Sequence, residues 1–141
     1  MLFRSYLYTR RFVSEYRADT DVGVNRSIRE SIGLSSYEGW LYIDAQLAYW
    51  RKAHEIHRWF VENIQKNVDN CAEYYVPHEK LVELRDWCAS ELAKFDGKPK
   101  AGYLSAEHWE QEHLKYTIEI CDQILEDPAL ANCDTYYRSS W

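Results

Sequence analysis

Residues 48–66 constrain the fold most, because their apolar side chains recur at three- and four-residue steps. These side chains are Tyr49, Ala53, Ile56, Phe60 and Ile64. Such spacing places them along one face of an α-helix, where they can pack into a core. A neighbouring stripe consists of Trp50, His54, His57 and Val61. The sequence therefore predicts a long amphipathic helix from about Ala48 to Lys66.

The first part of this helix is unusually rich in both rings and charges. Between Tyr49 and Phe60 the chain has four aromatic residues, two histidines and three cations. Polar groups that are buried need hydrogen-bond partners, so an ordinary core helix seldom carries so many of them. This composition indicates a place where something binds.

Three further helices are predicted from apolar spacing and end signals. The short one spans Asn25 to Leu34 and ends at Gly33, since glycine is favoured after a helix. Pro77 begins the next, which uses a stripe of leucines and ends before Gly97. The last runs from Ala106 to Glu126, where Pro128 stops it. Ser105 is its expected N-cap.

Four segments are predicted as strands. They are residues 2–8, Trp40 to Leu47, Glu73 to Val76 and the tail from Tyr136 to Trp141. The second could instead form the first turns of the helix that follows. We expect an α+β fold in one globular domain, 1–141, with three main helices packed on a small sheet of terminal and middle short strands. Such a sheet would bring the two termini together.

Composition excludes several classes of protein. With 46% apolar and 28% charged residues, the 141-residue chain is typical of a compact soluble domain. Its net charge of −6 argues against nonspecific binding of nucleic acid. No apolar run is long enough to span a membrane, and no secretory signal is evident, so we expect a cytoplasmic protein. The four cysteines lack closely spaced pairs, which favours reduced, mostly buried thiols.

The sequence contains no motif that points to catalysis or to a cofactor. It lacks a nucleophile elbow, a phosphate-binding loop and a dinucleotide fingerprint. His54 and His57 could share one helix face and seat a metal, but a third ligand would have to come from elsewhere, such as His108 or His113. We expect instead that His57 hydrogen-bonds inward and that His54 is partly exposed. No enzyme activity, metal or cofactor is predicted.

Several segments resemble a family of small, mostly uncharacterised bacteriophage and prophage proteins. The two terminal segments are Tyr6-Leu7-Tyr8-Thr9-Arg10-Arg11-Phe12-Val13-Ser14 and Tyr136-Tyr137-Arg138-Ser139-Ser140-Trp141. The third is Tyr49-Trp50-Arg51-Lys52-Ala53 with Ile56-His57 and Trp59-Phe60-Val61. The fourth is Cys71 with Glu73-Tyr74-Tyr75-Val76, followed by Leu81 and Leu84. The resemblance covers most of the chain and is weakest over residues 18–38. It implies a phage accessory protein acting in the cytoplasm of the bacterial host, and brings no catalytic mechanism.

The cations and flat rings suggest a ligand-binding site. The guanidinium group of arginine can form paired hydrogen bonds to a phosphate, and an aromatic ring can stack on a nucleotide base. The predicted ligand-binding residues are Trp50, Arg51, Lys52, His57, Tyr137, Arg138 and Trp141. Because phages carry small proteins that inhibit host immunity, our first hypothesis is that this protein sequesters a nucleotide-like immune signal.

Two other hypotheses belong to different classes. The surplus of Tyr and Trp suits a protein–protein inhibitor of a host defence or metabolic complex. A deep cationic pocket would favour sequestration, whereas a flat aromatic patch would favour the inhibitor. An enzyme would require a His or Cys aligned with an acid in a cleft. A homo-oligomer is also expected, most simply a symmetric dimer.

Overall fold

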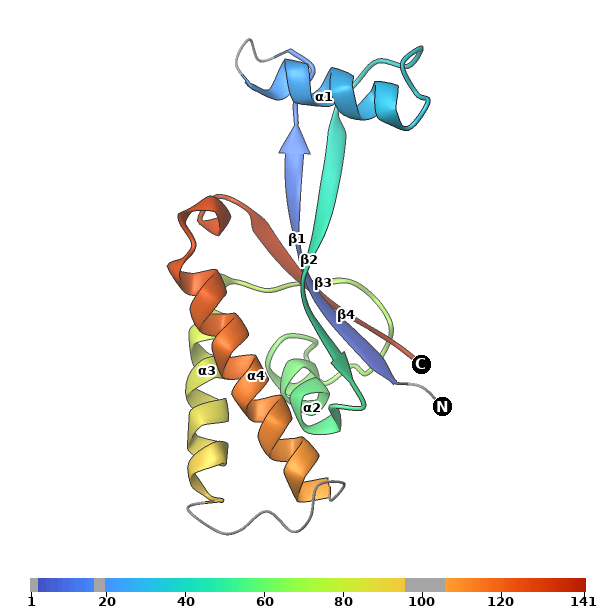
Figure 1. The fold of residues 1–141 in the computed structure, drawn as a ribbon. Helices are drawn as coiled ribbons and strands as arrows, with labels where there is room; N and C mark the ends of the chain where they lie inside the picture. The colour runs from blue at the N-terminus through green and yellow to red at the C-terminus, as the bar shows by residue number, and fades with distance from the viewer. Residues whose placement is uncertain (1–2, 17–19, 96–105) are drawn as a thin grey trace. The chain divides into compact units, whose positions relative to one another are not determined.

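The computed structural model describes residues 3–16, 20–95 and 106–141 (Figure 1). The elements follow in the order β1 (Arg4–Val13), α1 (Thr20–Ser31), β2 (Leu41–Arg51), α2 (His54–Asn63), β3 (Tyr74–Tyr75), α3 (His78–Ala93), α4 (Ala106–Glu126), a 3-10 turn at Pro128–Leu130, and β4 (Asp134–Ser140). The α+β class predicted from the sequence is confirmed. Ser105, Gly97 and Pro99, which were expected to bound α3 and α4, lie outside the described residues.

The four strands form one sheet in the order β2-β1-β4-β3. The first and last strands of the chain are therefore neighbours, and the ring of Phe3 stacks against that of Trp141. β3 runs antiparallel to β4, with Tyr74 opposite Tyr137. The predicted pairing of the terminal strands is confirmed.

The described chain divides into two compact units. The main unit consists of Met1–Thr9 and Gln46–Trp141, and the hairpin unit consists of Arg10–Ala45. β1 and β2 each contribute to both units, and α1 connects them within the hairpin unit. Whether the whole chain acts as a single domain remains a prediction.

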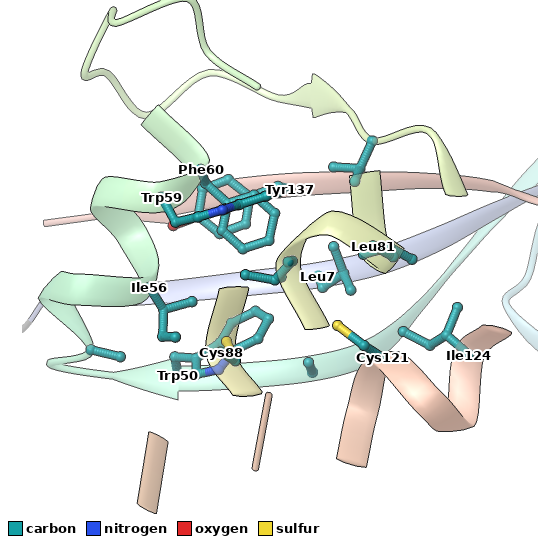
Figure 2. Packing of buried hydrophobic residues seen from close by; sticks show 14 of the residues in the cluster. Leu7, Trp50, Ile56, Trp59, Phe60, Leu81, Cys88, Cys121, Ile124 and Tyr137 are labelled. Atoms are coloured by element: carbon teal, nitrogen blue, oxygen red, sulfur yellow. The ribbon is translucent and has the colours of Figure 1, made fainter. Parts of the chain in front are cut away.

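In the main unit, three helices pack with the sheet around one apolar cluster. α3 and α4 lie side by side, and α2 also contacts α4 (Figure 1). The rings of Phe60 and Tyr137 stack nearly parallel, with centroids 3.8 Å apart, and Figure 2 shows them face to face. Leu81, Leu84 and Cys88 of α3 are buried, as their spacing predicted.

The predicted start of the long helix at Ala48 is wrong. Residues 48–51 belong to β2, where Ala48 and Trp50 are buried while Tyr49 and Arg51 face solvent. This two-residue alternation marks a strand, although the same residues also fit a helical stripe. The strand assignment for the preceding residues is confirmed, and β2 simply continues further.

The turn between β2 and α2 explains where the helix begins. Lys52 has a φ of 57°, a left-handed conformation that ends the strand. Its backbone N–H donates to the carbonyl of Phe3, 3.0 Å away. At the other end, Lys66 and Asn67 also have positive φ, so α2 stops at Asn63 rather than at Lys66.

A buried hydrogen bond joins β2 to α4. The indole Nε1 of Trp50 donates to Oγ1 of Thr117 at 2.9 Å, and that hydroxyl donates to the carbonyl of His113 at 2.7 Å. Trp50 is 2% exposed and Thr117 is fully buried. Loss of the acceptor would leave the indole N–H unsatisfied in an apolar site.

We expect Thr117→Val to lower the free energy of unfolding by about 1–3 kcal/mol, because valine keeps the shape and removes the acceptor. Urea denaturation followed by tryptophan fluorescence measures the loss. Thr135→Val is a matched control, since Thr135 is equally buried and its hydroxyl has no hydrogen-bond partner among the described residues. Equal losses in the two variants would contradict the assigned role of the bond.

The buried thiols make stability depend on pH. All four cysteines are free, and Cys88 and Cys121 are buried while Cys71 is exposed. Burial raises the pKa of the Cys88 thiol, and raises that of Cys121 to about 12. An unfolded thiol ionises near pH 8.5, so above about that pH the unfolded state binds fewer protons than the folded state. Stability therefore falls as the pH rises.

We expect Cys121→Ala to make this alkaline decline shallower, by up to about 1.4 kcal/mol per pH unit for the one thiol removed. The measurement is the free energy of unfolding in urea at several values between about pH 8 and pH 10.5. Cys71→Ala is the control and should retain the wild-type slope, because that side chain is exposed. An unchanged slope in Cys121→Ala would refute the assignment.

Candidate functional site

The main unit contains a groove of about 880 Å³ with a mostly apolar lining. It lies among the end of β2, the first turn of α2 and the first half of α4. The residues that line this groove are Tyr49, Trp50, Arg51, Lys52, His54, Glu55, Ala106, Trp109, Glu110, Glu112, His113 and Tyr116. Its volume is in the range of small-molecule sites.

One end of the groove is cationic. Arg51 and Lys52 are both exposed, and neither forms an ion pair with another described residue. His54 follows them at the first position of α2, whose N-cap residue, Ala53, provides no side-chain cap. The free N–H groups of a helix N-terminus favour an anion, which adds to the charge of the two cations.

The wall formed by α4 supplies aromatic rings. Trp109 is 46% exposed and Tyr49, opposite it on β2, is 36% exposed. The hydroxyl of Tyr116 accepts from the backbone N–H of Tyr49 at 3.2 Å, which ties the two walls together. The groove therefore offers flat ring faces beside its cations.

Carboxylates also line the groove, and two of them have basic side chains beside them. Glu55 Oε1 lies 2.7 Å from Nδ1 of His113. Glu112 lies 3.6 Å from the ammonium of Lys115. Burial, followed by the nearby acidic residues, raises the pKa of Glu110.

The residues predicted from the sequence do not form one site. Arg51 and Lys52 line the groove and are exposed, whereas Trp50 also borders it but is only 2% exposed and packs in the core. Tyr137 is fully buried, so it cannot stack on a ligand in this structure. Arg138 is exposed on β4 and does not line the groove.

His57 belongs to a separate, largely buried network. Its Nε2 lies 2.8 Å from a carboxylate oxygen of Asp69, and its Nδ1 lies 2.7 Å from the hydroxyl of Tyr137. Since a carboxylate only accepts, Nε2 donates to Asp69, and Nδ1 of the neutral ring accepts from Tyr137. Burial raises the pKa of Tyr137, which keeps that hydroxyl protonated. The prediction that His57 hydrogen-bonds inward is confirmed.

Trp141 is connected to the groove only through other rings. It is 48% exposed, and its ring contacts Phe3 and His57. Phe3 in turn stacks on His54, with centroids 5.2 Å apart, and His54 lines the groove. Trp141 itself does not line it, so its predicted stacking role would require a ligand that extends past His54.

The sequence reasoning missed the α4 side of this site. Trp109 was not predicted to bind a ligand, and His113 was considered only as a possible third metal ligand. Trp109, His113 and Tyr116 are four and three residues apart, a spacing that places them on one face of a helix. That pattern could have identified a polar and aromatic wall. Among the described residues, no group of three or more His, Cys, Asp or Glu is placed to hold a metal.

The hairpin unit has a smaller hollow of about 450 Å³, lined in part by Arg26, Arg29 and Glu30. The guanidinium of Arg29 donates to the carbonyls of Gly39 and Trp40 and is therefore engaged by the backbone. This hollow mixes cations with three carboxylates and is also lined by two exposed rings, those of Tyr16 and Tyr37, but its volume is about half that of the groove. The groove is the better candidate site.

Three large aromatic side chains are exposed together elsewhere in the hairpin unit. Phe12, Trp40 and Tyr42 are each about half exposed, and the rings of Trp40 and Tyr42 are 4.9 Å apart. The guanidinium of Arg10 lies 5.9 Å from the centre of the Tyr42 ring and is paired with Asp44. We call Phe12, Trp40 and Tyr42 the aromatic patch.

Comparison with known proteins identifies no relative. No protein-family model, curated protein or solved structure matches this chain. In the part of the chain that the structure describes, no helix is long and apolar enough to cross a membrane.

Proposed function

We propose that this protein binds a nucleotide-like anion in the groove and so removes it from solution. The observation that carries the proposal is the placement of two cations, Arg51 and Lys52, beside exposed rings in one concave site, with no ion pair between either cation and another described residue. A nucleotide needs both kinds of group, a cation for its phosphates and a flat face for its base.

The cationic end suits a phosphate in three ways. The guanidinium of Arg51 can form two parallel hydrogen bonds to phosphate oxygens. Lys52 adds a second positive charge, and its left-handed backbone places it at the turn that begins α2. The uncapped first turn of α2 adds backbone N–H donors at the same end.

The aromatic wall suits a base. Trp109 and Tyr49 expose enough ring surface for one stacked base, and such stacking is worth about 1–3 kcal/mol. The biological setting that we propose, sequestration of an immune signal by a phage protein in its host, comes from the family resemblance.

The test is the binding of defined nucleotides by the intact chain. We expect at least one member of a panel of mononucleotides, cyclic mononucleotides and cyclic dinucleotides to bind in isothermal titration calorimetry. Arg51→Ala should then weaken binding by about 10-fold or more, since charge-assisted hydrogen bonds are worth about 1.5–3 kcal/mol. Trp109→Ala should weaken it by a similar factor.

Two matched controls locate the site. Arg58→Ala and Arg138→Ala each remove one exposed arginine outside the groove, and both should bind as the wild type does. Loss of affinity in Arg138→Ala with none in Arg51→Ala would move the site away from the groove. Failure of every panel member to bind would count against the proposed function itself.

The second candidate function is inhibition of a host protein, and the aromatic patch favours it. Trp and Tyr dominate the binding energy of protein interfaces, and three clustered rings that are half exposed are costly to leave in water. This patch is formed by side chains of β1 and β2 and of Trp40 just before β2, all in the hairpin unit, and it uses none of the groove residues.

For this function we expect Trp40→Ala to reduce capture of a host protein by 10-fold or more, in line with the loss of an interface hot spot of about 2 kcal/mol. The measurement is quantitative mass spectrometry of proteins retained from bacterial lysate by the immobilised wild type and variant. Tyr16→Ala is the control, because Tyr16 is exposed in the same unit but lies outside the patch. Identical retention by all three proteins would exclude the patch as an interface.

A further inference from the structure

Glu55 and His113 form a carboxylate–imidazole pair on the wall of the groove. Glu55 Oε1 and His113 Nδ1 are 2.7 Å apart, and the two side chains are 23% and 18% exposed. Glu55 lies in the first turn of α2 and His113 in the middle of α4, so the pair joins two helices. Both residues line the groove that also contains Arg51 and Lys52.

This pairing leaves one ring nitrogen available. A carboxylate accepts hydrogen bonds and does not donate them, so in the neutral ring the proton is on Nδ1 and the lone pair is on Nε2. Nε2 of His113 has no hydrogen-bond partner in the described part of the chain, since the bond to Glu55 uses Nδ1. A histidine held in this way is arranged to take a proton from a bound molecule.

The pair differs from that of His57, another acid-bound histidine of the main unit. His57 uses both nitrogens, one with Asp69 and one with Tyr137, so neither is available. His113 uses one nitrogen and lies in a groove with two unpaired cations. Of these two acid-bound histidines, only His113 combines an open nitrogen with a place for a substrate.

We propose that the groove hydrolyses a phosphodiester bond of its nucleotide-like ligand, with His113 as general base and Glu55 as the positioning residue. This rests on the proposed function, because it requires that ligand in the groove. Nε2 of His113 removes a proton from a water molecule whose oxygen forms a new bond to phosphorus. The bond from phosphorus to the leaving oxygen breaks, the leaving oxygen takes a proton from solvent, and His113 returns its proton to solvent.

The rest of the groove supports this step. The hydrolysis consumes one water molecule for each phosphodiester bond that is broken, and it requires no oxidant or metal as a reactant. Arg51 and Lys52 offset the negative charge on the phosphoryl oxygens as the water adds. Glu55 keeps the imidazole in the required tautomer and stabilises the imidazolium that forms.

The test measures turnover and binding on the same full-length preparations. The probes are bis(4-nitrophenyl) phosphate, followed by absorbance, and the nucleotide panel, followed by chromatography of the products. We expect turnover by the wild type and a loss of about 10²-fold or more in kcat for His113→Asn, the usual contribution of a general base. Asparagine can still donate to Glu55 from its amide, so this variant retains the contact between helices.

Glu55 is tested by its separate effects on kcat and KM. Glu55→Gln should lower kcat with little change in KM, and Glu55→Asp should recover part of the loss because it restores the carboxylate. Glu119→Gln is the matched control, since Glu119 is an exposed acid on α4 outside the groove, and it should retain full activity. Circular dichroism and urea denaturation confirm that each variant is folded.

The outcomes separate this inference from the function on which it rests. Nucleotide binding without turnover by the wild type would overturn the hydrolysis and leave the sequestering function standing. Turnover that persists in His113→Asn would also overturn it, by excluding His113 as the base. Absence of both binding and turnover would reject the proposed function together with the hydrolysis.

Discussion

The buried hydrogen bond between Trp50 and Thr117 is the interaction on which the candidate site depends. It holds the end of β2 against α4, and these two elements are the walls of the groove. Because Thr117 also donates to the carbonyl of His113, the same contact positions the backbone that carries the catalytic candidate. The bond of Tyr49 to Tyr116 repeats the connection one residue earlier on β2.

A second set of contacts holds the other side of α2. The ring of Tyr137 stacks on Phe60 while its hydroxyl donates to His57, and His57 donates in turn to Asp69. These contacts join the last strand of the chain to α2. They explain why His57 and Tyr137 are better described as structural residues, although their polar atoms and rings resemble ligand-binding groups in the sequence.

The two proposals assign binding of the ligand and its hydrolysis to two pairs of residues in the groove. Arg51 and Lys52 are exposed and unpaired, so their charges are available to a ligand, whereas Glu55 is already paired with His113. A simple sequestering protein needs only the first pair. The second pair supplies the arrangement that an enzyme requires, a histidine aligned with an acid in a cleft. In these proposals turnover requires the Glu55–His113 pair in addition to the cations, whereas binding requires only the cations and rings, so the two can be measured independently.

Local patterns in the sequence were sufficient for the α+β class, the pairing of the terminal strands and the stripe of buried residues on α3. They also drew attention to Arg51 and Lys52, which line the groove, because cations beside aromatic residues are visible in the chain itself. Residues 48–51 fit both a strand and a helix, and only the burial of Trp50 against Thr117 decides for the strand. Likewise, Glu55 and His113 are 58 residues apart, so no local pattern could join them. The packing of α2 and α4 brings them together, because a contact between distant residues is set by the tertiary fold and not by the spacing of side chains along the chain.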